Sequence, residues 1–279
     1  MRIIELSLVT ETVRDLLVNA NHNINDDLLM ALEKALADEV SPLGKNVIGQ
    51  IIENDEIAQR KQVPMCQDTG IVVVFLEVGS EVSFKGDIYD AINEGVRQAY
   101  VGHFLRRSVV SHPIERKNTG DNTPAIIHTK IVPGDKIKIT VAPKGGGSEN
   151  MSLVKMLVPA DGIEGIKELV LKTVFESGGK PCPPIIVGLG IGGSFEKAAI
   201  IAKEALMRDI FDESPDPIAN QLEKELLKEI NKLGVGPMGF GGTVTALAVK
   251  VNTYPCHIAS LPVAINIQCH AARHKTAII

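Results

Sequence analysis

The spacing of hydrophobic residues divides the chain into a helical beginning and a mixed remainder. Apolar residues recur every three or four positions over 6–17, and a second series at 28–36 starts after Asn25, a residue type that caps helices. The pattern changes at 71–78, a continuous apolar run rich in β-branched residues that directly follows a Thr-Gly pair. Such a run is typical of a buried strand. We therefore expect helices over about 1–62 and a strand soon after.

The remainder of the chain alternates helical and strand patterns. A Pro-Gly-Asp turn at 133–135 separates two strand-like runs, which we expect to form a hairpin. The fold class is therefore α/β with mixed α and β elements: a helical N-terminal region of about 1–62 and a mixed-sheet core of about 63–279, within one domain of residues 1–279. Helical patterns cover 87–103, 163–175, 195–208 and 217–233, and strand patterns cover 125–131, 136–141, 185–189 and 243–251.

Composition narrows the classes of partner. The 29 basic and 34 acidic residues are well mixed and leave a formal charge of −5, which argues against a nucleic-acid footprint and a polybasic membrane anchor. No run approaches the roughly 18 apolar residues of a membrane helix, and the N-terminal apolar stretch is too short for a signal peptide. We expect a cytoplasmic protein with no nucleic-acid or membrane partner.

Three of the four cysteines, Cys66, Cys182 and Cys269, lie far apart in segments rich in small and polar residues. No C-x₂-C pair exists, so a structural zinc site is not favoured, and four cysteines without a secretory signal fit free thiols or metal ligands better than disulfides. Three thiolates on an iron–sulfur cluster would leave one iron open to a substrate. Free cysteine is also a common buried residue, so the residues alone leave packing and ligation evenly balanced. The fourth cysteine, Cys256, stays open as a ligand.

Glycine clusters at 145–147, 188–193 and 239–242 permit close backbone approach to an anion or a cluster. The second cluster also satisfies the G-x-G-x-x-G pattern of dinucleotide sites. However, no acidic residue closes a recognisable second strand about 20 positions later, because Asp209 falls near the end of a helical pattern. Nucleotide binding is therefore a minor alternative.

Four charged or titratable residues are candidates for substrate chemistry. Arg106 and Arg107 together form the best match to a carboxylate clamp, although an adjacent pair of this kind is often a solvated surface pair. Asp68 and His257 are the candidate proton-transfer groups, since histidine titrates near neutral pH and Asp68 lies two residues after Cys66. A lone histidine in an apolar stretch is also commonly a hydrogen-bonded structural residue.

Taken together, these segments resemble the α subunit of the iron–sulfur hydro-lyases of the class I fumarase and L-tartrate dehydratase family. The resemblance covers nearly the whole chain. It rests on six motifs: CQDTG at 66–70, NTGDNTPA at 118–125, KGGGS at 144–148, CPP at 182–184 followed by the glycines of 188–193, GFGG at 239–242, and CHAARH at 269–274.

The resemblance implies a 4Fe-4S cluster on Cys66, Cys182 and Cys269. Cys256 matches a position where relatives often carry threonine, so it is not expected to be a ligand. Asp68 and His257 are the implied catalytic residues. The residues implied to contact a dicarboxylate are Gln67, Asp68, Arg106, Gly145, Gly146 and Gly147, and the choice of Arg106 over Arg107 stays open.

The activity that the resemblance implies is the reversible dehydration of (S)-malate to fumarate, a tricarboxylic acid cycle reaction, with the open iron as Lewis acid. The sequence ends soon after the last motif, whereas single-chain relatives continue into a further domain, so we expect a separate β subunit and an assembly such as α2β2. Two alternatives remain. One is an L(+)-tartrate dehydratase α subunit, and the other is a non-catalytic metal-binding or redox-sensing protein.

Overall fold

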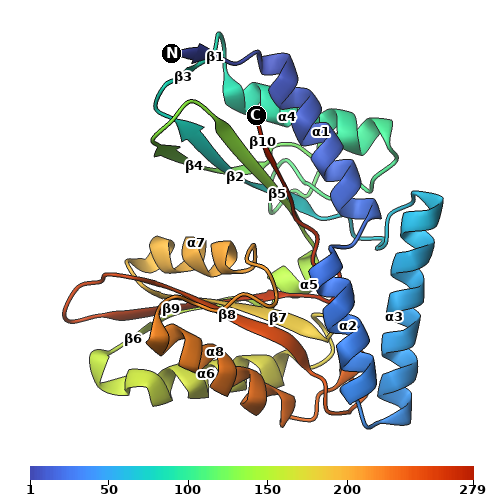
Figure 1. The fold of residues 1–279 in the computed structure, drawn as a ribbon, viewed down its shortest axis with the longest axis vertical. Helices are drawn as coiled ribbons and strands as arrows, with labels where there is room; N and C mark the ends of the chain where they lie inside the picture. The colour runs from blue at the N-terminus through green and yellow to red at the C-terminus, as the bar shows by residue number, and fades with distance from the viewer. The chain divides into compact units, whose positions relative to one another are not determined.

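The computed structural model describes all 279 residues, and these form two compact units. The first unit contains Met1–Ile24, Asp55–Gly146 and Arg273–Ile279, and the second contains Asn25–Asn54 and Gly147–Ala272. Both units combine helices with a four-stranded sheet, which confirms the mixed α/β class (Figure 1). No helix is both long enough and apolar enough to span a membrane.

The sheet of the first unit has the order β10-β5-β2-β4. Its centre is β2 (Ile71–Gly79), which pairs in parallel with β4 (Ile126–Val132) and antiparallel with β5 (Ile137–Lys144). The edge strand β10 (Lys275–Ile278) pairs antiparallel with β5. A separate short pair joins β1 (Arg2–Ile3) to β3 (Val82–Ser83).

The expected hairpin of 125–131 and 136–141 is wrong, although both strands exist. β2 lies between β4 and β5, so each of these strands pairs with β2 and they do not pair with each other. Five of the first eight residues of β2 are buried, so the main chain of this strand needs hydrogen-bond partners on both sides, away from water. The turn that suggested a hairpin instead joins two strands on opposite sides of a third.

Helices α1 (Leu6–His22) and α4 (Ile88–Gly102) pack together against this sheet. The helical spacing seen in the sequence places Val9, Val13 and Leu17 on one face of α1, and all three are completely buried. Gly95 of α4 permits the close approach, because a Cβ there would lie 2.6 Å from a main-chain oxygen of α1.

The second unit has a sheet of order β6-β9-β7-β8 with helices on both faces. Figure 1 shows α7 on one face and α6 with α8 on the other. The elements are α2 (Asp26–Asp38), α3 (Pro42–Lys61, which continues into the first unit), the one-turn α5 (Gly146–Glu149), β6 (Leu153–Leu157), α6 (Gly162–Ser177), β7 (Ile185–Gly192), α7 (Phe195–Ala205), α8 (Pro217–Asn231), β8 (Ala246–Tyr254) and β9 (Leu261–Gln268), with short 3-10 turns at Pro159–Asp161 and Pro237–Gly239.

The glycine motif at 188–193 has a packing role in this unit. Gly188 and Gly190 lie inside β7, where a Cβ would come within 2.2 Å of the main-chain oxygen of Ala202 and 2.0 Å of that of Ala198, both on α7. The absence of side chains lets α7 lie directly on the strand. In a dinucleotide site these glycines form the loop between strand and helix, so their place within β7 favours the packing role.

Candidate functional site

The loop at 66–70 and the glycines at 145 and 146 lie side by side at one end of the first sheet. The loop leads into β2 and the glycines follow β5, and the pairing of Ile71 with Lys144 fixes this arrangement. Asp68 joins the two segments: its Oδ2 accepts a hydrogen bond of 2.8 Å from the Gly146 amide, and its Oδ1 accepts one of 3.1 Å from the Gly70 amide. The structure therefore holds the Asp68 carboxylate in one orientation.

Gly145 borders the same carboxylate. A Cβ at this position would lie 3.2 Å from Asp68 Oδ2, closer than such contacts normally are, which explains why a larger residue does not fit easily. Gln67 precedes Asp68, and its exposed side chain makes no hydrogen bond. Three of the predicted substrate contacts, Asp68, Gly145 and Gly146, are thus neighbours, with Gln67 beside them.

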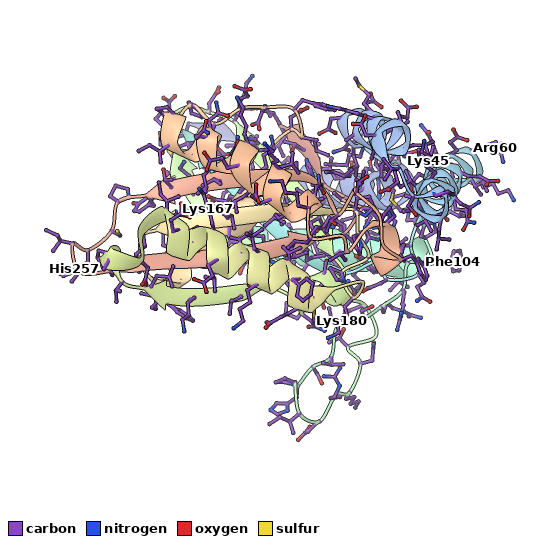
Figure 2. All side chains as sticks on the ribbon, turned by 90° about the horizontal axis from the view of Figure 1, so that it is seen from below. Lys45, Arg60, Phe104, Lys167, Lys180 and His257 are labelled. Carbon is purple, nitrogen blue, oxygen red and sulfur yellow. The ribbon has the colours of Figure 1, made fainter.

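Arg106 and Arg107 differ in a way that the sequence does not reveal. The guanidinium of Arg107 donates a hydrogen bond of 3.0 Å to the main-chain oxygen of Gly120. Arg106 is anchored through its backbone, because Thr69 Oγ1 donates 2.8 Å to its carbonyl, while its exposed guanidinium has no hydrogen bond or ion pair. Arg106 is therefore the arginine that is available to a carboxylate. A cleft of about 600 Å³ runs along both arginines and Phe104, which is labelled in Figure 2.

Two buried residues that the sequence did not single out support these loops. The hydroxyl of Tyr100 donates to the main-chain oxygen of Thr69 at 2.6 Å, and burial raises the pKa of this phenol, so it stays a donor. Asn122 donates to the Gly70 carbonyl at 3.1 Å and accepts from the Ser108 amide at 2.7 Å. Asn122 lies within the 118–125 motif, which was the available signal, whereas Tyr100 carried none.

In the second unit, Cys182 and Cys269 lie at the same end of the sheet. Cys182 precedes β7 and Cys269 follows β9, and these strands pair so that Ile186 faces Gln268. The two loops are joined directly, since the His270 amide donates a hydrogen bond of 3.3 Å to the Cys182 carbonyl. Gly147 belongs to this region as well: a Cβ there would lie 3.3 Å from the main-chain oxygen of Lys180.

None of the four cysteines forms a disulfide. Cys66 lies in the first unit and is half-buried, as are Cys182 and Cys269, whereas Cys256 is exposed. No group of three or more His, Cys, Asp or Glu side chains could hold a single metal ion. Three thiols on three separate glycine- or proline-bordered loops fit, in donor chemistry, a cluster bound through three of its irons.

His257 occupies a different place from the predicted ligands of its unit. It is exposed in the turn between β8 and β9, where its Nδ1 accepts a hydrogen bond of 3.1 Å from the Ala259 amide. Figure 2 labels it at the tip of this turn. It borders an apolar groove of about 370 Å³. The unit does not bring His257 to the end of the sheet that carries Cys182 and Cys269.

Comparison with known proteins assigns the class. The family described as Fumarate hydratase (Fumerase) matches residues 10–278. The chain belongs to this family, as the resemblance of its motifs predicts, and is a hydro-lyase of that family.

Curated relatives extend over nearly the same length. A Methanocaldococcus jannaschii protein, provisionally named L(+)-tartrate dehydratase subunit alpha, is 47% identical over 272 residues, or 95% of each chain. The L(+)-tartrate dehydratase subunit alpha of Escherichia coli and that of Shigella sonnei are each 31% identical over 274 residues, which cover 97% of this chain and 90% of the relative. These names fit the tartrate alternative better than the expected preference for malate.

Proposed function

We propose that this chain is the α subunit of an iron–sulfur hydro-lyase that removes water from a small 2-hydroxydicarboxylate, with L(+)-tartrate as the first candidate substrate. The observation that carries the proposal is that the exposed Arg106 guanidinium has no hydrogen bond or ion pair, while two main-chain amides hold the Asp68 carboxylate on the adjoining loop. A guanidinium can bind a substrate carboxylate through two parallel hydrogen bonds. The names of the relatives favour tartrate.

(S)-malate is the second candidate, because the family itself is described as Fumarate hydratase. Tartrate differs from malate by one additional hydroxyl group, on the carbon that loses the proton. A site that hydrogen-bonds this hydroxyl would discriminate strongly against the substrate that lacks it, since its own polar group would be left unpaired. The preference for tartrate or malate therefore depends on whether the site hydrogen-bonds the additional hydroxyl of tartrate.

We further propose Cys66, Cys182 and Cys269 as the ligands of a 4Fe-4S cluster, which supplies a Lewis acid for the departing hydroxide when bound. The donor chemistry of three thiols on three separate glycine- or proline-bordered loops supports this set.

Different residues of this chain bind the substrate and transfer the proton. Arg106 binds a substrate carboxylate, and the exposed amide of Gln67, with Gly145 and Gly146 on the neighbouring loop, contacts the same diacid. Asp68, fixed by two amides, accepts or returns a proton. The relatives are named α subunits, and we propose that a β subunit supplies the rest of the site, in an assembly such as α2β2.

The test is anaerobic reconstitution of this chain with a candidate β subunit, followed by assays with L(+)-tartrate and (S)-malate side by side. We expect about four irons and four sulfides per chain and a higher kcat/KM for tartrate. A higher kcat/KM for malate would replace the first candidate with the second. Stoichiometric zinc without sulfide, and no turnover of either diacid, would instead support the metal-binding or redox-sensing alternative.

A further inference from the structure

Arg273 is a buried arginine without an acidic partner. The residue is only 4% exposed, and it belongs to the first unit although it comes four residues after Cys269. Its Nη2 donates a hydrogen bond of 2.8 Å to the main-chain oxygen of Asp68, and its Nη1 donates one of 3.1 Å to Asn21 Oδ1. Its Nε has no hydrogen-bond partner. No carboxylate forms an ion pair with it. Buried arginines are normally paired with acids, so this charge requires an explanation.

Asn21 extends the contact to the other end of the same loop. It is completely buried at the end of α1, where its Nδ2 donates 2.9 Å to the Leu17 carbonyl. Its main-chain oxygen accepts a hydrogen bond of 3.0 Å from the Met65 amide. Arg273 and Asn21, joined by a hydrogen bond, therefore hold the Met65 amide on one side and the Asp68 carbonyl on the other. Only Cys66 and Gln67 lie between these two points.

The positive charge also faces the carboxylate of Asp68. A Cβ placed on Gly145 would lie 3.2 Å from Asp68 Oδ2 and 3.8 Å from Arg273 Nη2, so both groups border the same small space. The charge of Arg273 also acts on its other neighbour, because it opposes the rise that burial causes in the pKa of Tyr100. The guanidinium is thus surrounded by an amide oxygen, a main-chain carbonyl and the nearby Asp68 carboxylate, with no direct ion pair.

We propose that Arg273 is a positioning residue that sets the conformation of residues 65–68 and thereby places Cys66, Gln67 and Asp68. What these three residues do rests on the proposed function. The clamp itself is a property of the folded chain and can be tested without substrate or cluster.

The first experiment is hydrogen exchange, measured by mass spectrometry on the full chain without cluster. In Arg273→Met, exchange of the peptide covering 65–70 should rise at least about tenfold, because two charge-assisted hydrogen bonds are lost, while peptides of β2 and β5 stay protected. Asn21→Ala should give the same local rise, and the double variant should add little, because both residues act on one loop.

The matched control is Arg208→Met in the second unit. Arg208 is also largely buried and donates to Glu223, Asp212 and the Val251 carbonyl, far from the 65–70 loop in sequence. This variant should lower the melting temperature and leave exchange of the 65–70 peptide unchanged. Wild-type exchange of that peptide in both Arg273→Met and Asn21→Ala would overturn the proposal. If Arg273→Met fails to fold, Asn21→Ala decides the question.

The second experiment separates charge from geometry in the reconstituted enzyme. Arg273→Lys keeps the positive charge but cannot make both hydrogen bonds at once. We expect kcat to fall at least about tenfold while KM changes less than about threefold, since the clamp orients Asp68 and does not itself bind the diacid. Wild-type kcat in Arg273→Lys would contradict the geometric role. If the wild-type enzyme has no hydro-lyase activity, the proposed function fails while the exchange result still decides the clamp.

Discussion

His257 and Cys269 lie beyond opposite ends of the same strand. β9 runs from Leu261 to Gln268, with Cys269 directly after it and His257 in the turn before it. Its 8 residues span about 26 Å at about 3.3 Å each. A histidine so far from Cys269 cannot serve a cluster bound by that cysteine in the same copy. A catalytic part for His257 therefore requires a second copy of the chain.

This relationship makes a complementation experiment decisive. His257→Asn and Asp68→Asn should each be inactive when prepared alone. Mixed assemblies contain one site with both native residues if His257 acts across copies, so up to about a quarter of wild-type activity should return on mixing and refolding. No return of activity, with each variant folded, would remove His257 from the reaction. His22→Asn, which alters a buried histidine elsewhere, serves as the folding control.

Serine substitution distinguishes the cysteines. Cys66→Ser, Cys182→Ser and Cys269→Ser should each prevent assembly of a stable cluster, because serine is a poor replacement for thiolate on iron. Cys256→Ser should retain wild-type iron content, since Cys256 is exposed and its thiol only approaches the Ser260 carbonyl at 3.4 Å. Iron and sulfide analysis after anaerobic reconstitution provides the measurement. Equal loss of iron in Cys256→Ser would show that the ligand set is wrong.

The two adjacent arginines should differ in their effect on substrate binding. Arg106→Ala removes the unpaired guanidinium, and we expect KM for the diacid to rise about 10- to 100-fold, corresponding to about 1.5–3 kcal/mol for a hydrogen bond to a charged group. Arg107→Ala removes a hydrogen bond to a backbone carbonyl, so KM should change less than about threefold. Steady-state kinetics of the two variants measures this difference. The reverse order of effects would assign the clamp to Arg107.

Asp68→Asn tests whether the reaction requires the carboxylate of Asp68. The amide places one donor NH₂ group where Asp68 now accepts hydrogen bonds from the amides of Gly70 and Gly146, so one of these bonds must break. We expect kcat to fall about 10²- to 10⁴-fold, the usual contribution of a proton-transfer group. Asp90→Asn on the exposed face of α4 is the control and should keep wild-type kcat. A kcat near wild type in Asp68→Asn would exclude Asp68 as acid or base.

The stability that Glu39 contributes to the folded protein should be lost in acid. Its carboxylate is buried between α2 and α3, and it accepts hydrogen bonds from the amides of Ser41, Thr243 and Val244. Burial raises the pKa of Glu39, but these hydrogen bonds outweigh that effect and hold it below the usual range. A folded-state pKa below the unfolded one stabilises the protein above the unfolded pKa, and this stability is lost as the pH falls through the folded value.

Glu39→Gln should therefore lower the free energy of unfolding by about 1–3 kcal/mol at pH 7, because amides that now face a carboxylate would meet a weaker acceptor. The difference from wild type should shrink near pH 4. Urea unfolding at both pH values measures it, with the exposed Glu33→Gln as the control. A difference that stays constant between the two pH values would show that the charge of Glu39 is not the cause.

Local pattern was enough for most elements of the fold. The helical spacing over 6–17 predicted α1, because a 3.6-residue period reflects which helix face is buried, and the unbroken apolar run at 71–78 predicted β2, because such a run is typical of a buried strand. It could not predict the order β5-β2-β4, since strand pairing depends on which strand needs two covered edges. Nor could it show that Gly188 and Gly190 make room for a helix.

The sequence by itself determined the family of this protein, through the motifs that carry the three cysteines and Asp68. Only the tertiary structure decided which residues act together. It left Arg106 unpaired while Arg107 bonds a backbone carbonyl, it put His257 and Cys269 at opposite ends of β9, and it joined Arg273 to a loop 205 positions away. The physical reason is that residue type fixes what a side chain can donate or accept, whereas burial and strand pairing fix which partner it meets.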